Sequence, residues 1–482
     1  MSLISCIQNP ISERECDVTL SFLSPEFAYL ALIFFPIYWL LSARPTVQKV
    51  FLLIASYSLY ATWSYKTALF LGAYSSVVWL LGIWVRTGLN PAKKMKLSIS
   101  FIFALSLLFV TKYYEFFREL LTQLLTQVGL PFFLPAVDVI VPVGISFFTF
   151  QAITYLLWEY QAKVKVSFLD LLLYLSFWPT LFAGPIIRAK DFHEQLYSQN
   201  FGKPMASSKA IYFIFLGLFQ KMVLATWLAN HYVDAVFKYP EEFLAVDTLH
   251  GILAYTLQIF FDFSGYTLIV TGFGLLLGFT LPLNFAQPYL SHNLKEFWQR
   301  WHISLSSFIR DFVYIPMGGN RRGFAWSQVN IFIAMLISGI WHGAGLGFLL
   351  WGVIHGVGLV GSNLLRRYVP LRLPAFCGQI LTFLFVAFAW VFFKASSMES
   401  ALRLLERLSA PLGEFNLSWV YLWTFTLLFF LLSKYANWFE SQMINWISRL
   451  NLWLLIPILC LIGYIIIELS PPGIPSFIYY QF

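Results

Sequence analysis

The sequence predicts an all-α, multi-pass membrane protein, and its composition carries that prediction. Of its 482 residues, 59% are hydrophobic and only 11% are charged. A soluble domain carries about 25% charged residues, so this chain has too little charge to cover a water-facing surface. Aromatic residues reach 20%, with 51 Phe, 25 Tyr and 18 Trp, which suits helices packed in lipid and anchored at its interfaces. An array of soluble domains is therefore excluded.

The net charge of +8 does not indicate a nucleic-acid-binding protein. Most Lys and Arg residues stand in short gaps between apolar runs, where the positive-inside rule places them beside the cytoplasmic leaflet. The four cysteines, Cys6, Cys16, Cys377 and Cys460, are scattered. They form no CxxC pair, and no His stands at metal-ligand spacing, so we expect neither a disulfide framework nor a metal site.

Apolar runs along the chain predict the helices, because a spanning helix needs about 20 mostly apolar residues. The runs lie near 27–42, 50–63, 67–85, 97–110, 139–158, 168–187, 208–229, 249–279, 325–341, 344–364, 375–394, 418–433 and 451–470. Some of these runs contain proline, at Pro36, Pro142, Pro179 and Pro185. The prolines indicate tilted, re-entrant or half-spanning helices. A membrane tolerates such helices where their backbone is buried in protein or lines a wet cavity. We predict about 10 to 13 crossings around an internal cavity, in one domain over 1–482 with an N-terminal extension over 1–25.

Basic gaps predict the orientation of the first helices. The groups that we expect in the cytoplasm are Arg44 with Lys49, and Arg86 with Lys93, Lys94 and Lys96. The two runs between these groups form one hairpin, whose tip carries only Lys66 and fits the outside face.

Residues 292–323 interrupt the apolar rhythm with five Lys or Arg against two acidic residues. Phe297, Trp301, Leu305 and Phe308 recur at steps of three or four and form one apolar stripe. This spacing predicts a basic helix in the cytoplasmic interface plane, followed by a turn at Gly318-Gly319-Asn320. The segment could anchor the chain on anionic lipid, or it could bind a polyphosphate ligand from the cytoplasm.

Three histidines stand late in the chain in Trp- and Gly-rich surroundings: His302, His342 and His355. Ionisable side chains at membrane depth are costly and are therefore functional candidates. The glycines of Gly339-Ile340-Trp341-His342-Gly343-Ala344-Gly345 let a backbone or a slender substrate approach His342. His355 follows 13 residues later, so the two rings would share a helix face only if the helix broke between them.

Elimination narrows the chemistry that these histidines could serve. No GxSxG elbow occurs, and the glycines from Gly272 to Gly278 follow no strand and are interpreted as helix packing rather than a phosphate loop. Asp262 is expected to be paired or to face a cavity, and Glu159 and Arg188 similarly, with structural roles in helix packing. A neutral imidazole can act as a general base on a hydroxyl that attacks an acyl donor. A thioester such as acyl-CoA fits, because its phosphates suit a basic cluster. The candidate donor-binding residues are Lys295, Arg300, Asn320, Arg321 and Arg322.

An ordered set of motifs resembles the membrane-bound O-acyltransferase (MBOAT) superfamily, in the branch of bacterial alginate O-acetyltransferase membrane subunits. The matching segments are Pro142-Val143-Gly144-Ile145-Ser146-Phe147, Ala183-Gly184-Pro185-Ile186-Ile187-Arg188, Phe260-Phe261-Asp262-Phe263-Ser264-Gly265-Tyr266, Phe297-Trp298-Gln299-Arg300-Trp301-His302-Ile303-Ser304-Leu305-Ser306, Gly318-Gly319-Asn320-Arg321-Arg322-Gly323 and Trp341-His342-Gly343-Ala344. They run in order from about residue 20 to 400, and the whole set is far more specific than any single motif.

The resemblance implies a ring of helices around a thinned centre with a central tunnel. It implies His342 as the catalytic residue and His302 as the second characteristic position. It also implies transfer of acetyl groups from cytoplasmic acetyl-CoA across a bacterial inner membrane, with no permanently bound cofactor. A periplasmic SGNH-type partner would then acetylate an envelope polysaccharide such as alginate or peptidoglycan.

The chain departs from the family pattern in two places. Thr267-Leu268-Ile269 follows Phe263-Ser264-Gly265-Tyr266 where the family commonly has Ser-Asp-Met, so a second carboxylate near Asp262 is missing. The N-terminus is also about 20 residues longer than expected. Three alternatives stay open: a related enzyme that moves D-alanyl or lipid acyl groups, a glycan transporter, and a scaffold without catalysis. The sequence does not specify the polymer, the partner's docking face or the oligomeric state.

Overall fold

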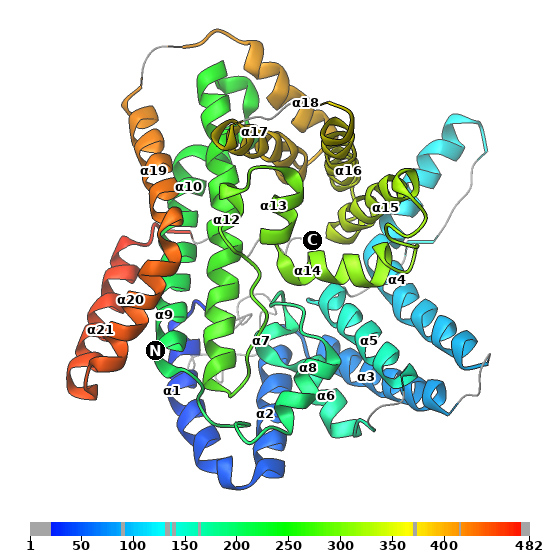
Figure 1. The fold of residues 1–482 in the computed structure, drawn as a ribbon, viewed down its shortest axis with the longest axis vertical. Coiled ribbons are helices and arrows are strands. Elements are labelled where there is room, and N and C mark those ends of the chain that lie inside the picture. The colour runs from blue at the N-terminus through cyan, green and yellow to red at the C-terminus, as the bar shows by residue number, and fades with distance from the viewer. Residues whose placement is uncertain are drawn as a thin grey trace, which may run out of the picture.

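The fold, seen in a computed structural model, is built from helices that surround a centre of short helices (Figure 1). The structure describes residues 21–87, 92–130, 135–136, 141–161, 165–369, 374–413 and 416–473. Across these ranges the extended pairing is one isolated bridge, between Phe285 and Trp301. The predicted all-α class is confirmed. Most of the N-terminal extension, including Cys6 and Cys16, lies outside the described residues.

The helices fall into a longer group and a shorter group. The longer helices are α1 (Pro25–Leu40), α2 (Pro45–Ala61), α3 (Tyr65–Arg86), α4 (Ala92–Gln127), α5 (Ile145–Tyr160), α9 (Ser207–Leu218), α12 (Ala245–Leu276), α15 (Phe324–His342), α16 (Leu346–Tyr368), α17 (Ala375–Lys394), α19 (Leu417–Lys434), α20 (Ala436–Arg449) and α21 (Leu452–Leu469). The shorter helices are α6 (Phe168–Ser176), α7 (Trp178–Leu181), α8 (Ala189–Leu196), α10 (Thr226–Leu228), α11 (Asp234–Lys238), α13 (Leu294–Arg300), α14 (Ile303–Ile309) and α18 (Met398–Glu406). The π-helical segments are η3 (Phe219–Ala225), η4 (Ala229–Val233) and η7 (Arg310–Tyr314). The 3₁₀ turns are η2 (Leu41–Ala43), η5 (Pro240–Glu242), η6 (Pro288–Leu290) and η8 (Arg407–Ser409).

Ten helical segments among the described residues are long and apolar enough to cross a membrane. The apolar runs at 50–63, 139–158 and 168–187 are not among them. The first two form helices of 17 and 16 residues, and the third divides where α6 ends and Pro179 enters the first turn of α7. Proline suits that position because the first helical N–H needs no intrahelical partner. Pro36, in contrast, lies inside α1 without ending it.

Helix α12 stands upright to the left of the short helices α13 and α14 in Figure 1, and nearly all of its residues are buried. Close approach to α9 depends on glycine: a Cβ at Gly272 would lie 2.8 Å from the carbonyl oxygen of Ala210, and one at Gly265 would lie 2.8 Å from that of Gly217. Small residues let membrane helices pack at short range. Gly265 and Gly272 therefore serve the packing of α12 against α9.

Charged residues inside the bundle are paired across helices. Asp262 pairs with Lys221, and Glu159 pairs with Arg86 at 3.3 Å. Of the two alternatives that the sequence left open, pairing or facing a cavity, the structure shows pairing for both acidic residues. Partners are what a buried ion needs in order to offset its desolvation.

Two further pairs join segments far apart in sequence. Arg188 pairs with Asp311. Lys49 is buried inside α2 and pairs with Asp170 at 3.0 Å, so it does not stand in a basic loop as the sequence suggested.

The basic segment after residue 292 differs from the single continuous helix that its spacing predicted. It forms α13 and α14, with Trp301 extended and His302 in the left-handed region at φ 42° between them. The stripe of Phe297, Trp301, Leu305 and Phe308 is almost completely buried in the protein core. The stripe therefore packs against protein and does not face lipid.

Candidate active site

His342 is the last residue of α15, and the neighbouring helix α4 holds that helix end. The final carbonyl groups of a helix have no intrahelical donors. Lys112 Nζ donates to the carbonyl oxygens of Trp341 at 2.8 Å and His342 at 3.1 Å, and Tyr113 Oη donates to that of Ile340 at 2.5 Å. Two adjacent side chains of α4 therefore cap the end of the helix that carries His342.

His302 is positioned by the break between α13 and α14. Around it, Ala286 N donates to Arg300 O at 3.0 Å and Ile303 N donates to Asn284 O at 3.0 Å. These bonds clamp the turn, which explains how a non-glycine residue is held at positive φ, a conformation concentrated at functional sites. His302 lies outside the ten candidate spans, and burial lowers the pKa of its imidazole to about 3. The ring is therefore neutral at pH 7.

Aromatic rings connect the three histidines. The centroid of His342 lies 5.0 Å from that of Trp341 and 5.0 Å from that of Trp351. The Trp341 ring also contacts His302, at 6.1 Å, and the Trp351 ring contacts His355, at 4.8 Å. The chain does break between His342 and His355, at the turn from α15 to α16, which is the condition the sequence set for bringing their rings together.

His355 has a defined hydrogen-bond acceptor role. Trp298 Nε1 donates to His355 Nδ1 at 3.3 Å, so the proton of the neutral ring is on Nε2. Trp298 belongs to α13, and this bond therefore connects the short central helix to α16.

A cavity of about 750 Å³ leads along α15 toward His342. The α15 residues that line it are Phe324, Ser327, Gln328, Ile331, Ala334, Met335 and Ser338. Their spacing of three or four follows one helix face, and His342 stands four residues after Ser338 on that face. The cavity therefore ends about one helical turn from the histidine.

The cavity has a cationic lining. Lys295, Arg310, Arg366 and Arg367 line it, and no carboxylate is among its described lining residues; Arg310 pairs with the neighbouring Asp311 at 2.7 Å. Arg366 donates to Asn363 Oδ1 at 3.1 Å, and the Arg367 guanidinium lies 4.3 Å from the Phe324 ring centroid. Such a lining attracts anionic groups and suits phosphates.

The structure brings only part of the predicted donor-binding set together. Lys295 and Asn320 line the cavity. Arg321 and Arg322 are exposed and do not line it, and Arg321 donates to Ile315 O at 3.2 Å. Arg300 lines a separate groove and pairs with Glu296 at 2.6 Å.

Sequence reasoning missed three cations of this cavity: Arg310, Arg366 and Arg367. The signal available was the Arg366-Arg367 pair at the end of an apolar run, where basic residues favour the negative end of a helix. Nothing local joins that pair to Lys295, which lies far away in sequence.

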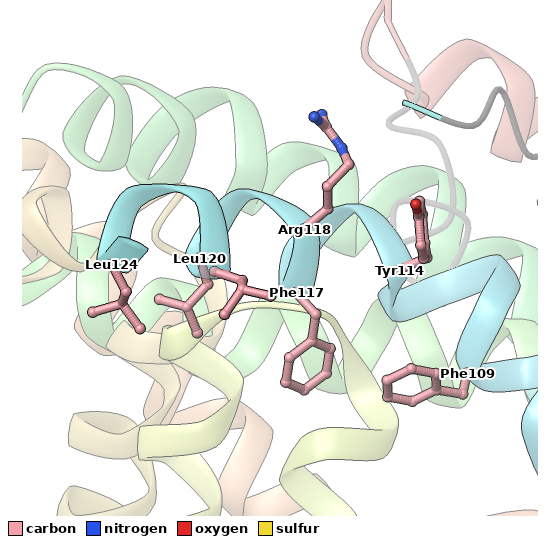
Figure 2. Close-up of a pocket in the computed structure, with 7 residues that line it drawn as sticks. Phe109, Tyr114, Phe117, Arg118, Leu120 and Leu124 are labelled. Atoms are coloured by element: carbon pink, nitrogen blue, oxygen red, sulfur yellow. The ribbon is translucent and has the colours of Figure 1, made fainter. Parts of the chain in front are cut away.

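A second hollow, on α4, has different properties. Figure 2 shows Phe109, Phe117, Leu120 and Leu124 on one side of the helix, with Arg118 pointing away from them. Arg118 pairs with Glu115 at 2.6 Å, and the remaining lining is almost wholly apolar. The chemistry-bearing side chains are therefore in the cavity along α15.

Ten spanning segments and a buried histidine cluster at the end of a cationic cavity define a multi-pass membrane protein with an internal polar site. Residues 37–402 match the membrane-bound O-acyltransferase family, MBOAT, and the chain belongs to that family. It is therefore a membrane-bound acyltransferase.

Named relatives cover most of the chain. It is 34% identical over 411 residues to the probable alginate O-acetylase AlgI of Pseudomonas syringae pv. tomato, which covers 82% of this chain and 76% of that protein. It is 34% identical over 418 residues to the peptidoglycan O-acetyltransferase of Helicobacter pylori, covering 79% of this chain and 77% of the relative. A teichoic acid D-alanyltransferase of Streptococcus thermophilus is 32% identical over 239 residues, or 45% of this chain and 55% of that protein.

Proposed function

We propose that this protein moves acetyl groups from cytoplasmic acetyl-CoA across a bacterial inner membrane for O-acetylation of an envelope polysaccharide. The observation that carries the proposal is the cavity along α15. Its lining includes Lys295, Arg310, Arg366 and Arg367, and along α15 it runs from Phe324 to Ser338, one turn before His342. That arrangement matches a donor with a phosphate-rich head and a reactive thioester at the end of a long arm.

In this proposal His342 acts as the general base. It takes the proton of an acceptor hydroxyl while the hydroxyl oxygen attacks the thioester carbonyl carbon. The C–S bond then breaks, and the proton passes to the sulfur that leaves as the CoA thiol. Atoms and charge balance without a metal or a redox partner.

The side chains around His342 assist it, but they do not act as the general base. His302 is neutral at pH 7 and borders the same Trp341 ring as His342. A neutral ring can orient the thioester or relay a proton, but it adds no charge to the site. The acyl group beside His342 would be enclosed by Trp341, Trp351 and Phe393, whose ring centroids lie 5.0 to 5.1 Å from that of His342.

The acceptor is proposed from the relatives. The Pseudomonas relative is named for alginate and the Helicobacter relative for peptidoglycan. We propose that the acetyl group leaves the site on the outer side for a periplasmic SGNH-type partner, which transfers it to the polymer.

The test is transfer from radiolabelled acetyl-CoA in proteoliposomes by the wild type and by His342→Ala. Label that reaches an acceptor on the far side only with wild type is the expected result. Equal transfer by a folded His342→Ala variant would show that this residue has a structural role, and the transporter or scaffold alternatives would then explain the protein better.

Charge variants separate the donor cavity from other basic surfaces. Arg366→Glu with Arg367→Glu should raise the apparent KM for acetyl-CoA. The matched pair, Arg321→Glu with Arg322→Glu, lies outside the cavity lining and should raise it less. If Arg321→Glu with Arg322→Glu raised the apparent KM more than the cavity pair did, donor binding would be assigned to the Gly318–Gly323 turn.

One alternative donor has a specific observation in its favour. The Streptococcus relative is named for D-alanyl transfer to teichoic acid, and it aligns with under half of this chain. Competition between acetyl-CoA and an aminoacyl carrier protein distinguishes the two donors. Turnover of the carrier alone would replace the acetyl assignment and leave the acyltransferase assignment intact.

A further inference from the structure

The separate groove that Arg300 lines lies between α17 and α19, apart from the donor cavity and from the hollow on α4. It is a groove of about 710 Å³ with a mostly apolar lining that includes Ile380, Leu384 and Leu427. Leu427 is 62% exposed and Ile380 is 40% exposed, and both helices are candidate membrane spans. In a membrane this groove therefore opens toward lipid.

The groove ends in a group of basic side chains from three segments. His292 precedes α13, Arg300 ends α13, and Lys434 is the last residue of α19; all three line the groove. Glu296 holds two of them in place, through its pair with Arg300 at 2.6 Å and its contact with His292 Nδ1 at 3.2 Å. Glu296 therefore fixes the positions of two of the three basic side chains at this end of the groove.

The charge of this cluster favours an anion. Burial alone would raise the pKa of the Glu296 carboxyl, but hydrogen bonds from His292 and the charge of Arg300 outweigh burial and lower it. Glu296 is therefore a carboxylate at pH 7 and offsets one cation. The remaining positive charge includes Lys434, which lies in the last turn of α19.

The length of the groove corresponds to one leaflet. From Trp423 to Lys434 the α19 lining spans 11 residues, which is about 16 Å at 1.5 Å per residue. Half of a hydrocarbon core of about 30 Å is about 15 Å. A lipid with its headgroup at Lys434 would lay its acyl chains along the groove to the bilayer midplane.

We propose that this groove is a specific binding site for one anionic phospholipid of the surrounding leaflet. Arg300, Lys434 and His292 bind its phosphate, and the apolar walls of α17 and α19 hold its chains. Basic pockets between membrane helices are known to select anionic headgroups. Arg300 thus serves a lipid, whereas Lys295 on the same short helix faces the donor cavity.

Native mass spectrometry of protein reconstituted with phosphatidylglycerol or phosphatidylcholine tests the site without any acyl-transfer assay. The wild type should retain one phosphatidylglycerol in preference to phosphatidylcholine. Arg300→Gln with Lys434→Gln should lower that preference by about tenfold, or about 1.4 kcal/mol. Each of the two cations attracts an anionic headgroup, and Glu296 opposes part of that attraction.

The chain offers a matched control for the charge variant. Arg403 pairs with Glu399 four residues away, as Arg300 does with Glu296, and Lys238 lies beside a tyrosine ring at a helix end, as Lys434 does. Arg403→Gln with Lys238→Gln should retain the lipid as the wild type does. If the control loses as much as the groove variant, net charge explains the retention and the proposal is wrong.

Filling the groove tests the apolar half without changing charge. Ile380→Trp with Leu427→Trp should reduce retention of phosphatidylglycerol, because the added rings occupy the space of the chains. Full retention by this variant would overturn the site. Displacement of the lipid by inorganic phosphate, with no effect of groove filling, would identify a phosphate site in its place.

Discussion

Lys112→Met should lower both stability and catalysis, because it removes the side chain that caps the end of α15 and positions His342. Lys112 Nζ donates to the carbonyl oxygens of Trp341 and His342, and to Ser146 Oγ at 3.4 Å. Methionine keeps much of the apolar stem and removes every donor. Two carbonyl groups in a buried setting would then lack these partners, at about 1–3 kcal/mol each. We expect a loss of about 2–6 kcal/mol in stability, measured as a lower apparent melting temperature in detergent.

Catalysis should suffer separately from stability. His342 is the terminal residue of its helix, so fraying there moves the imidazole directly. A displacement near 1 Å at a reacting group can cost about a hundredfold in rate. In acyl transfer from acetyl-CoA, kcat should therefore fall by about that factor. KM should change little, because Lys112 does not line the donor cavity.

Two variants of the same helix serve as controls. Lys112→Arg keeps donors at the position and should retain part of the activity. Tyr113→Phe removes the bond to Ile340 O, two residues before His342, and should lower stability by about 1 kcal/mol with a smaller effect on kcat. A Lys112→Met protein that melts early but turns over at the wild-type kcat would refute the idea that this cap positions His342.

Three further changes test other parts of the structure. In the unfolded chain His302 titrates near 6.5, and its folded pKa is about 3. The unfolded state therefore binds more protons between these values, and about 2 kcal/mol of stability should be lost by pH 5; His302→Gln should remove most of that acid loss in melting curves. Asp262→Asn breaks the buried pair with Lys221 and should cost about 3–5 kcal/mol, whereas Asp262→Leu with Lys221→Met should cost less in chemical unfolding. Gly352→Ala places a Cβ 2.8 Å from Met335 O and should cost about 1–3 kcal/mol; an unchanged melting temperature would contradict the close α15–α16 packing.

Much of the helix pattern could be predicted because apolar length alone decides it in a membrane. The apolar runs near 325–341 and 344–364 became α15 and α16 within a few residues. The glycines of Gly343-Ala344-Gly345 separate them, as local sequence suggests. The pairing of Asp262 could also be predicted, since an intramembrane carboxylate needs a partner. Its partner could not, because Lys221 lies on another helix.

The break at His302 had no local signal. No proline or glycine stands between Leu294 and Ile309, and the spacing of apolar residues fits one helix. The chain is turned there by tertiary contacts: the Phe285–Trp301 bridge and the Asn284 side chain, which accepts from Ser304 N at 3.1 Å. Local periodicity therefore identified the apolar stripe, but it missed that the stripe is buried in the protein core and it missed the direction of the backbone. Arg300 lies before this break and points to a different hollow from Lys295.

The geometry of α15 bears on how an acyl group could cross the membrane. From Phe324 to Ser338 the cavity follows 14 residues of the helix, which is about 21 Å at 1.5 Å per residue. The hydrocarbon core is about 30 Å thick. A donor bound at the cationic end would therefore carry its acyl group through most of that distance on its own arm. Under the proposed function, the acceptor hydroxyl that His342 deprotonates takes the group over only the last part of the path, and no rocking of one half of the protein against the other is required.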